Sequence, residues 1–257
     1  MSVRFRARRL GPVPLLRRAR TRGFPPSGNG ASSFHLGWRL PAGARHLVAA
    51  SVTLEVLTPP VVDHLYFWAL QVAFPGAGAA HLGLQWNHRH PGFGAVNWGG
   101  YAADGSLLVG TESPLPSTPA DPNTRDYPWE PERPYRLGLH RTEDSAWRGG
   151  VTDLGTGDAT TVRDLMAVAP HLGDPMVWSE VFARCDDPPV TVRWSNFEVV
   201  TDGGHRFAPT ALAVNYQSNA DGGCANTTSA LNDGSGVLQV TNAERTTPQD
   251  TALPLAT

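Results

Sequence analysis

The strongest constraint on the fold is an alternation of apolar and polar side chains within residues 46–57, HLVAASVTLEVL. The apolar positions of one parity are Val48, Ala50, Val52, Leu54 and Val56. An extended chain turns successive side chains to opposite faces, so this period of two predicts a strand with one buried face. A helix would require a period of 3.6 residues instead.

Further short segments of strand character follow at close intervals. They are residues 64–74, 80–87, 93–101, 106–110, 135–141, 146–152, 176–184, 190–200, 212–217 and 236–241. A proline-rich stretch, residues 112–134, predicts a long irregular loop, and residues 161–168 are the one segment that favours a helical turn or two. With 27 Gly and 23 Pro in 257 residues, this pattern predicts an all-β fold, an antiparallel β-sandwich of the jelly-roll type.

Charge is distributed unevenly along the chain. All 21 basic residues are Arg, and eight of them lie in residues 4–22, whereas all 23 acidic residues follow, beginning with Glu55. The body is therefore acidic. Because proteins bind nucleic-acid phosphates mainly through cationic side chains, we expect no nucleic-acid partner. No apolar run is long enough for a membrane span, so we expect no membrane partner either. We expect three regions: a disordered Arg-rich tail (1–30), a sandwich domain (31–204) and a C-terminal β segment packed on it (205–257).

Several short motifs, taken in order, resemble one known superfamily. They are HLYFWALQVAF, LGLQWN, GAVNWGGY, YPWEPERPYRLGL and VRWSNFEVV, which together span most of residues 40–200. This order is similar to the concanavalin A-like lectin/glucanase superfamily, and within it to bacterial proteins known as a domain of unknown function. The resemblance implies a glycan bound on the concave face of one sheet, with sugar rings stacked on aromatic side chains and amides bonding their hydroxyls.

The candidate ligand-binding residues are aromatic and amide side chains in or beside predicted strands. They are Gln85, Trp86, Asn87, Trp98, Trp178 and Trp194. An indole offers an apolar face together with an N–H group, which suits a sugar platform, although a sandwich core also uses Trp. Both readings stay open for each Trp.

Glu180 is the candidate catalytic residue. It shares strand parity with Trp178 and Phe182, and desolvation among aromatic rings would raise its pKa, as a general acid requires. The alternative is a Glu paired with Arg184 or Arg193, or one that faces solvent. The E-x-D-x-x-E pattern of the glucanase branch is missing, which argues against a glucanase.

Metal and cysteine patterns leave alternatives open. His81, His88 and His90 could ligate a metal, but Pro91 and Gly92 mark a hairpin end where solvated His is ordinary, so we expect no metal site there. Calcium binding and plain turn formation both account for the oxygen-rich segments 186–187, 219–226 and 232–235, and we expect no other cofactor. A bridge between Cys185 and Cys224 would indicate an extracellular protein, and two free thiols a cytoplasmic one.

Three functions are consistent with these observations. The first is a non-catalytic carbohydrate-binding or surface-interaction sandwich, with a glycan as its partner. The second is a carbohydrate-active hydrolase or lyase that uses Glu180. The third is a structural or protein-interaction domain in which loop 112–134 and the acidic surface form the partner face. We favour the first, while the sequence leaves the ligand and the oligomeric state undetermined.

Overall fold

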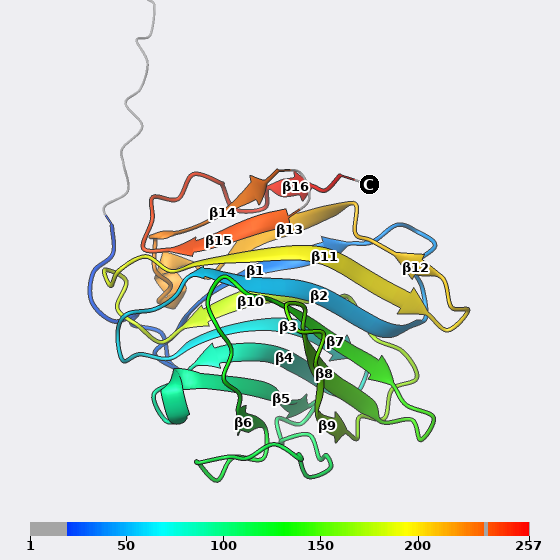
Figure 1. The fold of residues 1–257 in the computed structure, drawn as a ribbon. Coiled ribbons are helices and arrows are strands. Elements are labelled where there is room, and N and C mark those ends of the chain that lie inside the picture. Colours follow the sequence, from blue (N-terminus) through cyan, green and yellow to red (C-terminus); the bar gives the residue numbers. More distant parts are fainter. Residues whose placement is uncertain (1–19, 234–235, 257) are drawn as a thin grey trace, which may run out of the picture.

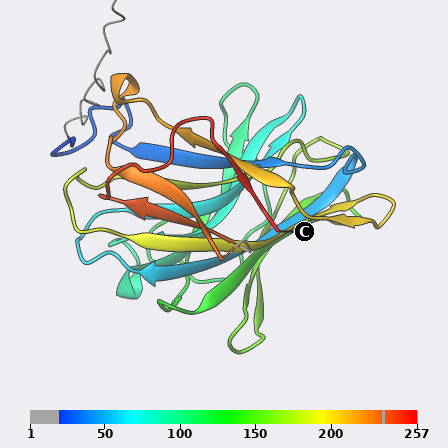
Figure 2. The same cartoon turned by 90° about the horizontal axis from the view of Figure 1, so that it is seen from above.

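Two antiparallel β-sheets packed face to face make up the computed structural model of the protein, which describes residues 20–233 and 236–256. Figure 1 shows β11, β2 and β7 in one layer and β1, β10 and β3 in the other, and Figure 2 shows the two layers from above. This architecture confirms the predicted all-β sandwich. Residues 1–19, most of the expected N-terminal tail, lie outside the described part of the chain.

The first sheet, sheet A, has the strand order β16-β13-β1-β10-β3-β4-β5-β6. In chain order its strands are β1 (Ser32–Arg39), β3 (Tyr66–Phe74), β4 (Gly78–Trp86), β5 (Gly94–Ala102), β6 (Thr124–Asp126), β10 (Met176–Val181), β13 (Ala211–Tyr216) and β16 (Ala252–Pro254). Its four central strands, β1, β10, β3 and β4, pair antiparallel in unbroken register.

The second sheet, sheet B, has the order β14-β15-β11-β2-β7-β8-β9, with β12 paired to β11. Its strands are β2 (Leu47–Thr58), β7 (Pro134–Arg141), β8 (Trp147–Asp153), β9 (Ala159–Leu165), β11 (Thr191–Thr201), β12 (Arg206–Phe207), β14 (Thr227–Asn232) and β15 (Gly236–Thr241). Two 3-10 turns, η1 (Pro91–Phe93) and η2 (Asn219–Asp221), supply the helical residues of the described chain. No helix in residues 20–233 or 236–256 is long and apolar enough to cross a membrane.

The core lies between the sheets and follows the alternation seen in the sequence. Val52, Leu54 and Val56 of β2 are at most 1% exposed, and they face large side chains of sheet A such as Trp68. A buried glutamine also joins the layers, because Oε1 of Gln239 on β15 accepts from Ser179 Oγ (2.8 Å) and from Trp194 Nε1 (2.9 Å). Its Nε2 donates to the carbonyl of Phe34 on β1.

Several segments differ from the sequence prediction. The expected helical turn at 161–168 overlaps β9, which pairs with β8, because sheet pairing outweighs a weak local preference. Residues 106–110 form isolated bridges rather than a strand, and β1 was not among the predicted strands. The C-terminal segment supplies strands to both sheets, β13 and β16 to sheet A and β14 and β15 to sheet B.

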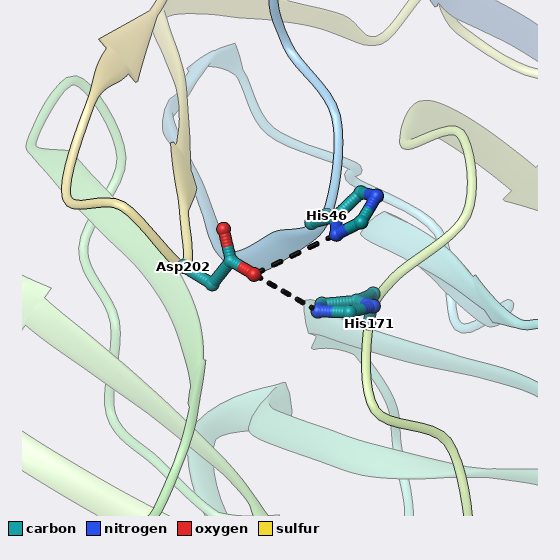
Figure 3. A group of neighbouring side chains, drawn as sticks. All are labelled: His46, His171 and Asp202. Atoms are coloured by element: carbon teal, nitrogen blue, oxygen red, sulfur yellow. Dashed lines mark ion pairs between the residues drawn. The ribbon is translucent and has the colours of Figure 1, made fainter.

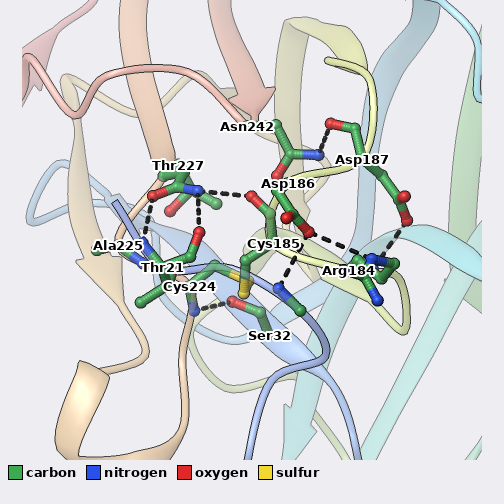
Figure 4. Close-up of a disulfide and its surroundings, with 12 residues drawn as sticks. Thr21, Ser32, Arg184, Cys185, Asp186, Asp187, Cys224, Ala225, Thr227 and Asn242 are labelled. Atoms are coloured by element: carbon green, nitrogen blue, oxygen red, sulfur yellow. Dashed lines mark hydrogen bonds and ion pairs between the residues drawn. A yellow bond between two sulfur atoms is a disulfide. The ribbon is translucent and has the colours of Figure 1, made fainter. Parts of the chain in front are cut away.

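A disulfide joins Cys185, after β10, to Cys224, before β14 (Figure 4). The N-terminal residues 20–30 lie against it: the Cys185 N–H donates to the carbonyl of Gly23, and the Ala225 N–H donates to Thr21 Oγ1. The bridge therefore ties together three segments that are far apart in the sequence. Both cysteines are bonded, so the two free thiols considered from the sequence do not occur.

Candidate functional site

A hollow of about 250 Å³ opens on the outer face of sheet A, the face turned away from the core. We call it the sheet A hollow and define it by its lining residues: Ser33, His35, Gln71, Ala79, His81, Tyr101, Trp178 and Glu180. Three of these were singled out from the sequence: Trp178, Glu180 and, as a possible metal ligand, His81.

Strand register brings these residues together. Ser33 lies opposite Glu180, and His35 opposite Trp178, on the adjacent strands β1 and β10. Gln71 of β3 lies opposite His81 of β4. Because directly opposed residues of an antiparallel pair project to the same face, these cross-strand pairs form a continuous polar surface over four neighbouring strands.

The floor beside the hollow is apolar and forms a small cluster separate from the main core. It consists of Phe67, Ala69 and Trp178, each at most 5% exposed, with Met176 packed against them. The rings of Phe67 and Trp178 meet edge to face at 4.9 Å, and His81 lies 5.7 Å from the Trp178 ring. An apolar floor on the outer face of a sheet is the feature that sets this surface apart from an ordinary solvated face.

Glu180 is half-buried within this surface. Its Oε1 accepts a hydrogen bond from Asn29 Nδ2 at 3.2 Å and a longer one from Ser33 Oγ at 3.4 Å. Burial raises the pKa of Glu180, and the two hydrogen bonds oppose that rise only in part. The cations considered as its partners are engaged elsewhere, since Arg184 pairs with Asp186 and Arg193 with Glu55. Glu180 therefore has the raised pKa of a group able to give or take a proton.

The two histidines of the hollow are neutral at pH 7. Burial lowers the pKa of His81 to about 4, and burial also lowers the pKa of His35. A neutral imidazole offers one donor and one acceptor nitrogen. The hollow thus presents hydrogen-bonding groups without positive charge from these side chains.

Gln71 is held in one orientation by Trp178. The indole Nε1 donates to Gln71 Oε1 at 2.9 Å. An indole N–H can only donate, so the amide oxygen faces it and the amide NH₂ is left for a ligand.

Two of the predicted ligand-binding tryptophans lie in the core instead. Trp98 and Trp194 are 0% exposed, and their indole N–H groups donate to the carbonyl of Trp147 and to Gln239. Both stand at the inward parity of their strands, so in this structure they cannot stack on a ligand. The expectation that these two tryptophans form platforms for a sugar ring is therefore wrong. The number of Trp residues does not indicate which face of a strand each of them occupies.

The predicted group Gln85, Trp86 and Asn87 lies at the end of β4, outside the sheet A hollow. The Trp86 ring stacks on Phe93 at 4.6 Å, and its Nε1 donates to the carbonyl of Val62. Asn87 donates to Gln85 Oε1 and also accepts from the Arg89 N–H. These bonds hold the turn that follows β4.

The histidines considered as metal ligands face separate partners. His88 Nδ1 lies 3.6 Å from Asp63, and His90 Nδ1 lies 2.6 Å from Asp126, whereas His81 belongs to the hollow. Asp186, considered for calcium, accepts from the Gly23 N–H and pairs with Arg184. Residues 234 and 235 of the third oxygen-rich segment lie outside the described chain.

Sequence reasoning missed Ser33, His35 and Gln71. The available signals were the alternation in SSFHLGWR and the single polar residue, Gln71, in the otherwise apolar YFWALQVAF. Alternation indicates the face on which a residue lies but not which strands are neighbours in the sheet. It therefore could not predict that these three residues lie beside Glu180.

The fold and site define a two-sheet antiparallel β-sandwich with a polar hollow on one outer face. No family model matches the chain, and no curated protein sequence matches it. Among solved structures it is similar to Scytalido-glutamic peptidase with a peptide-based transition state analog (8% identity, 82% of this chain and 98% of that one, TM-score 0.49). It is also similar to SCP-B, a member of the Eqolisin family of peptidases, in complex with the tripeptide Ala-Ile-His (9% identity, 82% and 98% covered, TM-score 0.48).

A further solved structure, peanut lectin with a 9mer peptide, is 11% identical over 70% of this chain and 69% of that one, with a TM-score of 0.30. At such identities the similarities concern the fold and assign no activity to this chain. The β-sandwich class rests on the strand pairing described above.

Proposed function

We propose that the protein binds a neutral carbohydrate, through one sugar ring seated in the sheet A hollow, and that it belongs to the concanavalin A-like superfamily. The observation that carries this proposal is the combination of an aromatic floor with a rim of hydrogen-bonding groups in which Glu180 is the one carboxylate. Sugar rings present apolar C–H faces and neutral hydroxyls, which this combination matches.

The size and charge of the hollow support the same ligand class. Its volume of about 250 Å³ lies just below the roughly 300 Å³ at the small end of ligand pockets, which suits one ring rather than a long chain. Its lining residues include neither Lys nor Arg, so an anionic ligand would find no counter-charge in the lining.

A second candidate, a glycan-cleaving enzyme, is favoured by one observation: burial raises the pKa of Glu180. A protonated Glu at the rim could act as a general acid. Glycosidases, however, generally use two carboxyl groups about 5–9.5 Å apart, and Glu180 is the one carboxylate among the lining residues. For this reason we place binding before catalysis.

The test is binding of the purified, folded protein to an array of oligosaccharides and polysaccharides, with and without calcium. Trp178→Ala and Gln71→Leu should abolish a specific hit while the circular dichroism spectrum stays that of the wild type. Trp86→Phe, outside the hollow, is the matched control and should bind normally. Binding that survives both hollow variants would contradict the proposal.

Glu180→Gln separates the two candidates. A binder keeps most of its affinity in this variant and releases no product from the glycan. An enzyme keeps its affinity but loses turnover, measured by chromatography of the products. A blank array from folded protein would favour the protein-interaction function, which loop 112–134 would then serve.

We also propose that the protein is extracellular. The support is the disulfide between Cys185 and Cys224, because such bridges persist in oxidising compartments and are rare in the cytosol. Thiol labelling of the protein taken directly from its native cells tests this. Two unreactive cysteines before reduction are expected, and two freely labelled ones would contradict the proposal.

A further inference from the structure

Two histidines and one aspartate from three separate loops converge next to the start of β2 and the end of β11 (Figure 3). His46 precedes β2, His171 precedes β10, and Asp202 follows β11. One ligand atom from each lies within 4.8 Å of the others. We propose that His46, His171 and Asp202 bind a single divalent transition-metal ion of the Zn²⁺ class.

The backbone fixes this meeting of loops. The Asp202 N–H donates to the carbonyl of His46 at 3.0 Å, and the Leu172 N–H donates to the carbonyl of Leu47 at 2.8 Å. Each of the three residues is also next to a buried one, since Leu47, Leu172 and Thr201 are at most 5% exposed. The side chains are therefore presented from anchored positions, which reduces the entropy lost when a ligand orders them.

The distances fit a shared metal better than hydrogen bonds. Oδ2 of Asp202 lies 3.6 Å from His46 Nδ1 and 3.4 Å from His171 Nε2, both beyond the roughly 3.2 Å limit of a good N–H···O bond. Ligands about 2.0–2.1 Å from a tetrahedral zinc lie about 3.3–3.4 Å from one another. The same carboxylate oxygen faces both imidazoles, whereas two hydrogen bonds could be divided between its two oxygens.

The donor types define the class of metal. A ligand set of two imidazoles and one carboxylate is typical of Zn²⁺, Ni²⁺ or Cu²⁺. Calcium is not expected here, because it takes six or more oxygen ligands. The two rings are 4.6 Å apart between centroids, so both imidazoles lie close enough to share one ion. Three protein ligands leave a fourth position for water or for a group from a partner molecule. His46 and Asp202 are more than half exposed, so this position faces solvent.

The test uses the untagged full-length chain, stripped of metal and titrated with zinc chloride in competition with a chromogenic chelator. We expect one equivalent of zinc in the wild type and loss of this equivalent in His46→Ala/His171→Ala. Asp202→Asn should weaken binding at least as much as the roughly 10–100-fold that loss of an outer-sphere partner costs. Cobalt(II) in place of zinc should give the intense visible absorption of a four-coordinate site.

Matched controls come from the other histidines. His88 also faces a carboxylate at 3.6 Å on the surface, so His88→Ala should leave zinc binding unchanged, as should His35→Ala in the hollow. Zinc should raise the melting temperature of the wild type but not of the double variant. The proposal is overturned if the double variant retains the equivalent, if the wild type binds none, or if either control loses it.

Discussion

The indole N–H of Trp178 donates to the side-chain oxygen of Gln71 at 2.9 Å, across the outer face of sheet A. This bond satisfies a nearly buried donor, and because it occupies the amide oxygen of Gln71, the NH₂ group of this lining residue is left for a ligand. One contact therefore serves both the stability of the sheet face and the orientation of a binding group. The two roles can be separated by substitution.

Replacing Gln71 by Leu should lower the free energy of unfolding by about 1–3 kcal/mol, because the Trp178 N–H loses its acceptor. Gln71→Glu keeps an acceptor oxygen and should cost less. Urea unfolding of the two variants checks this. If both variants lose the same free energy of unfolding, the hydrogen bond to Trp178 is not the cause of the loss.

Replacing Glu180 by Gln should raise stability at neutral pH. The pKa of Glu180 is raised by burial, so the folded state binds a proton more readily than the unfolded state does. Stability is therefore lost as the pH rises through the unfolded pKa of about 4.3 toward the higher folded value. Unfolding curves measured from about pH 4 to about pH 7 should therefore show this loss of stability in the wild type but not in the Gln variant.

Exposed Glu143 provides the control for Glu180. Glu143→Gln should leave the free energy of unfolding near the wild-type value. If Glu180→Gln is less stable than the wild type at neutral pH, the carboxylate must have a stabilising partner that the structure does not show.

His81 should make stability fall as the pH drops below neutrality. Its pKa is lowered by burial to about 4, whereas an unfolded His takes up its proton near pH 6.5. The unfolded state therefore binds more protons between these values, with a slope of at most about 1.4 kcal/mol per pH unit, and the stability is fully present above pH 6.5. NMR titration of the imidazole measures the pKa directly, and a pKa near 6.5 for His81 would contradict the effect of its burial.

Replacing Gln239 by Leu should cost roughly 3 kcal/mol or more, since three buried groups lose a partner. These are the Ser179 hydroxyl, the Trp194 indole N–H and the Phe34 carbonyl. Ser179→Ala removes one of these bonds and should cost about 1 kcal/mol. Chemical unfolding measures the free energy of unfolding of both variants. If Gln239→Leu loses less stability than Ser179→Ala does, Gln239 does not tie the sheets together.

Removing the disulfide with Cys185→Ser/Cys224→Ser should cost about 4 kcal/mol by the chain-entropy relation for a loop of this length. The bridged residues are 39 apart in the sequence. Unfolding of the wild type with and without a reductant should reproduce the difference. A reduced wild type as stable as the oxidised one would show that the hydrogen bonds of Thr21 and Gly23 beside the bridge are enough to hold these segments together.

Local pattern in the sequence predicted much of the fold. Residues 46–57 predicted a strand that the structure has as Leu47–Thr58, and the two segments 190–200 and 236–241 correspond closely to β11 and β15. These strands are predictable because alternation records which side chains meet the core. The segment 161–168 misled because its pattern is weak, and it becomes a strand only through pairing with β8.

For the sheet A hollow, the sequence by itself determined that Glu180 and Trp178 share a face, since they are two residues apart on one strand. His81 also stands at the opposite parity to the apolar Ala80, Leu82 and Leu84, which indicates the outer face of its strand. Tertiary structure alone decided that Ser33 and His35 lie beside them and that Gln71 bonds Trp178, because sheet order and register arise from contacts between distant segments. The same reason explains why His46, His171 and Asp202 could not be grouped from sequence: their meeting depends on loops that only the packed sandwich brings together.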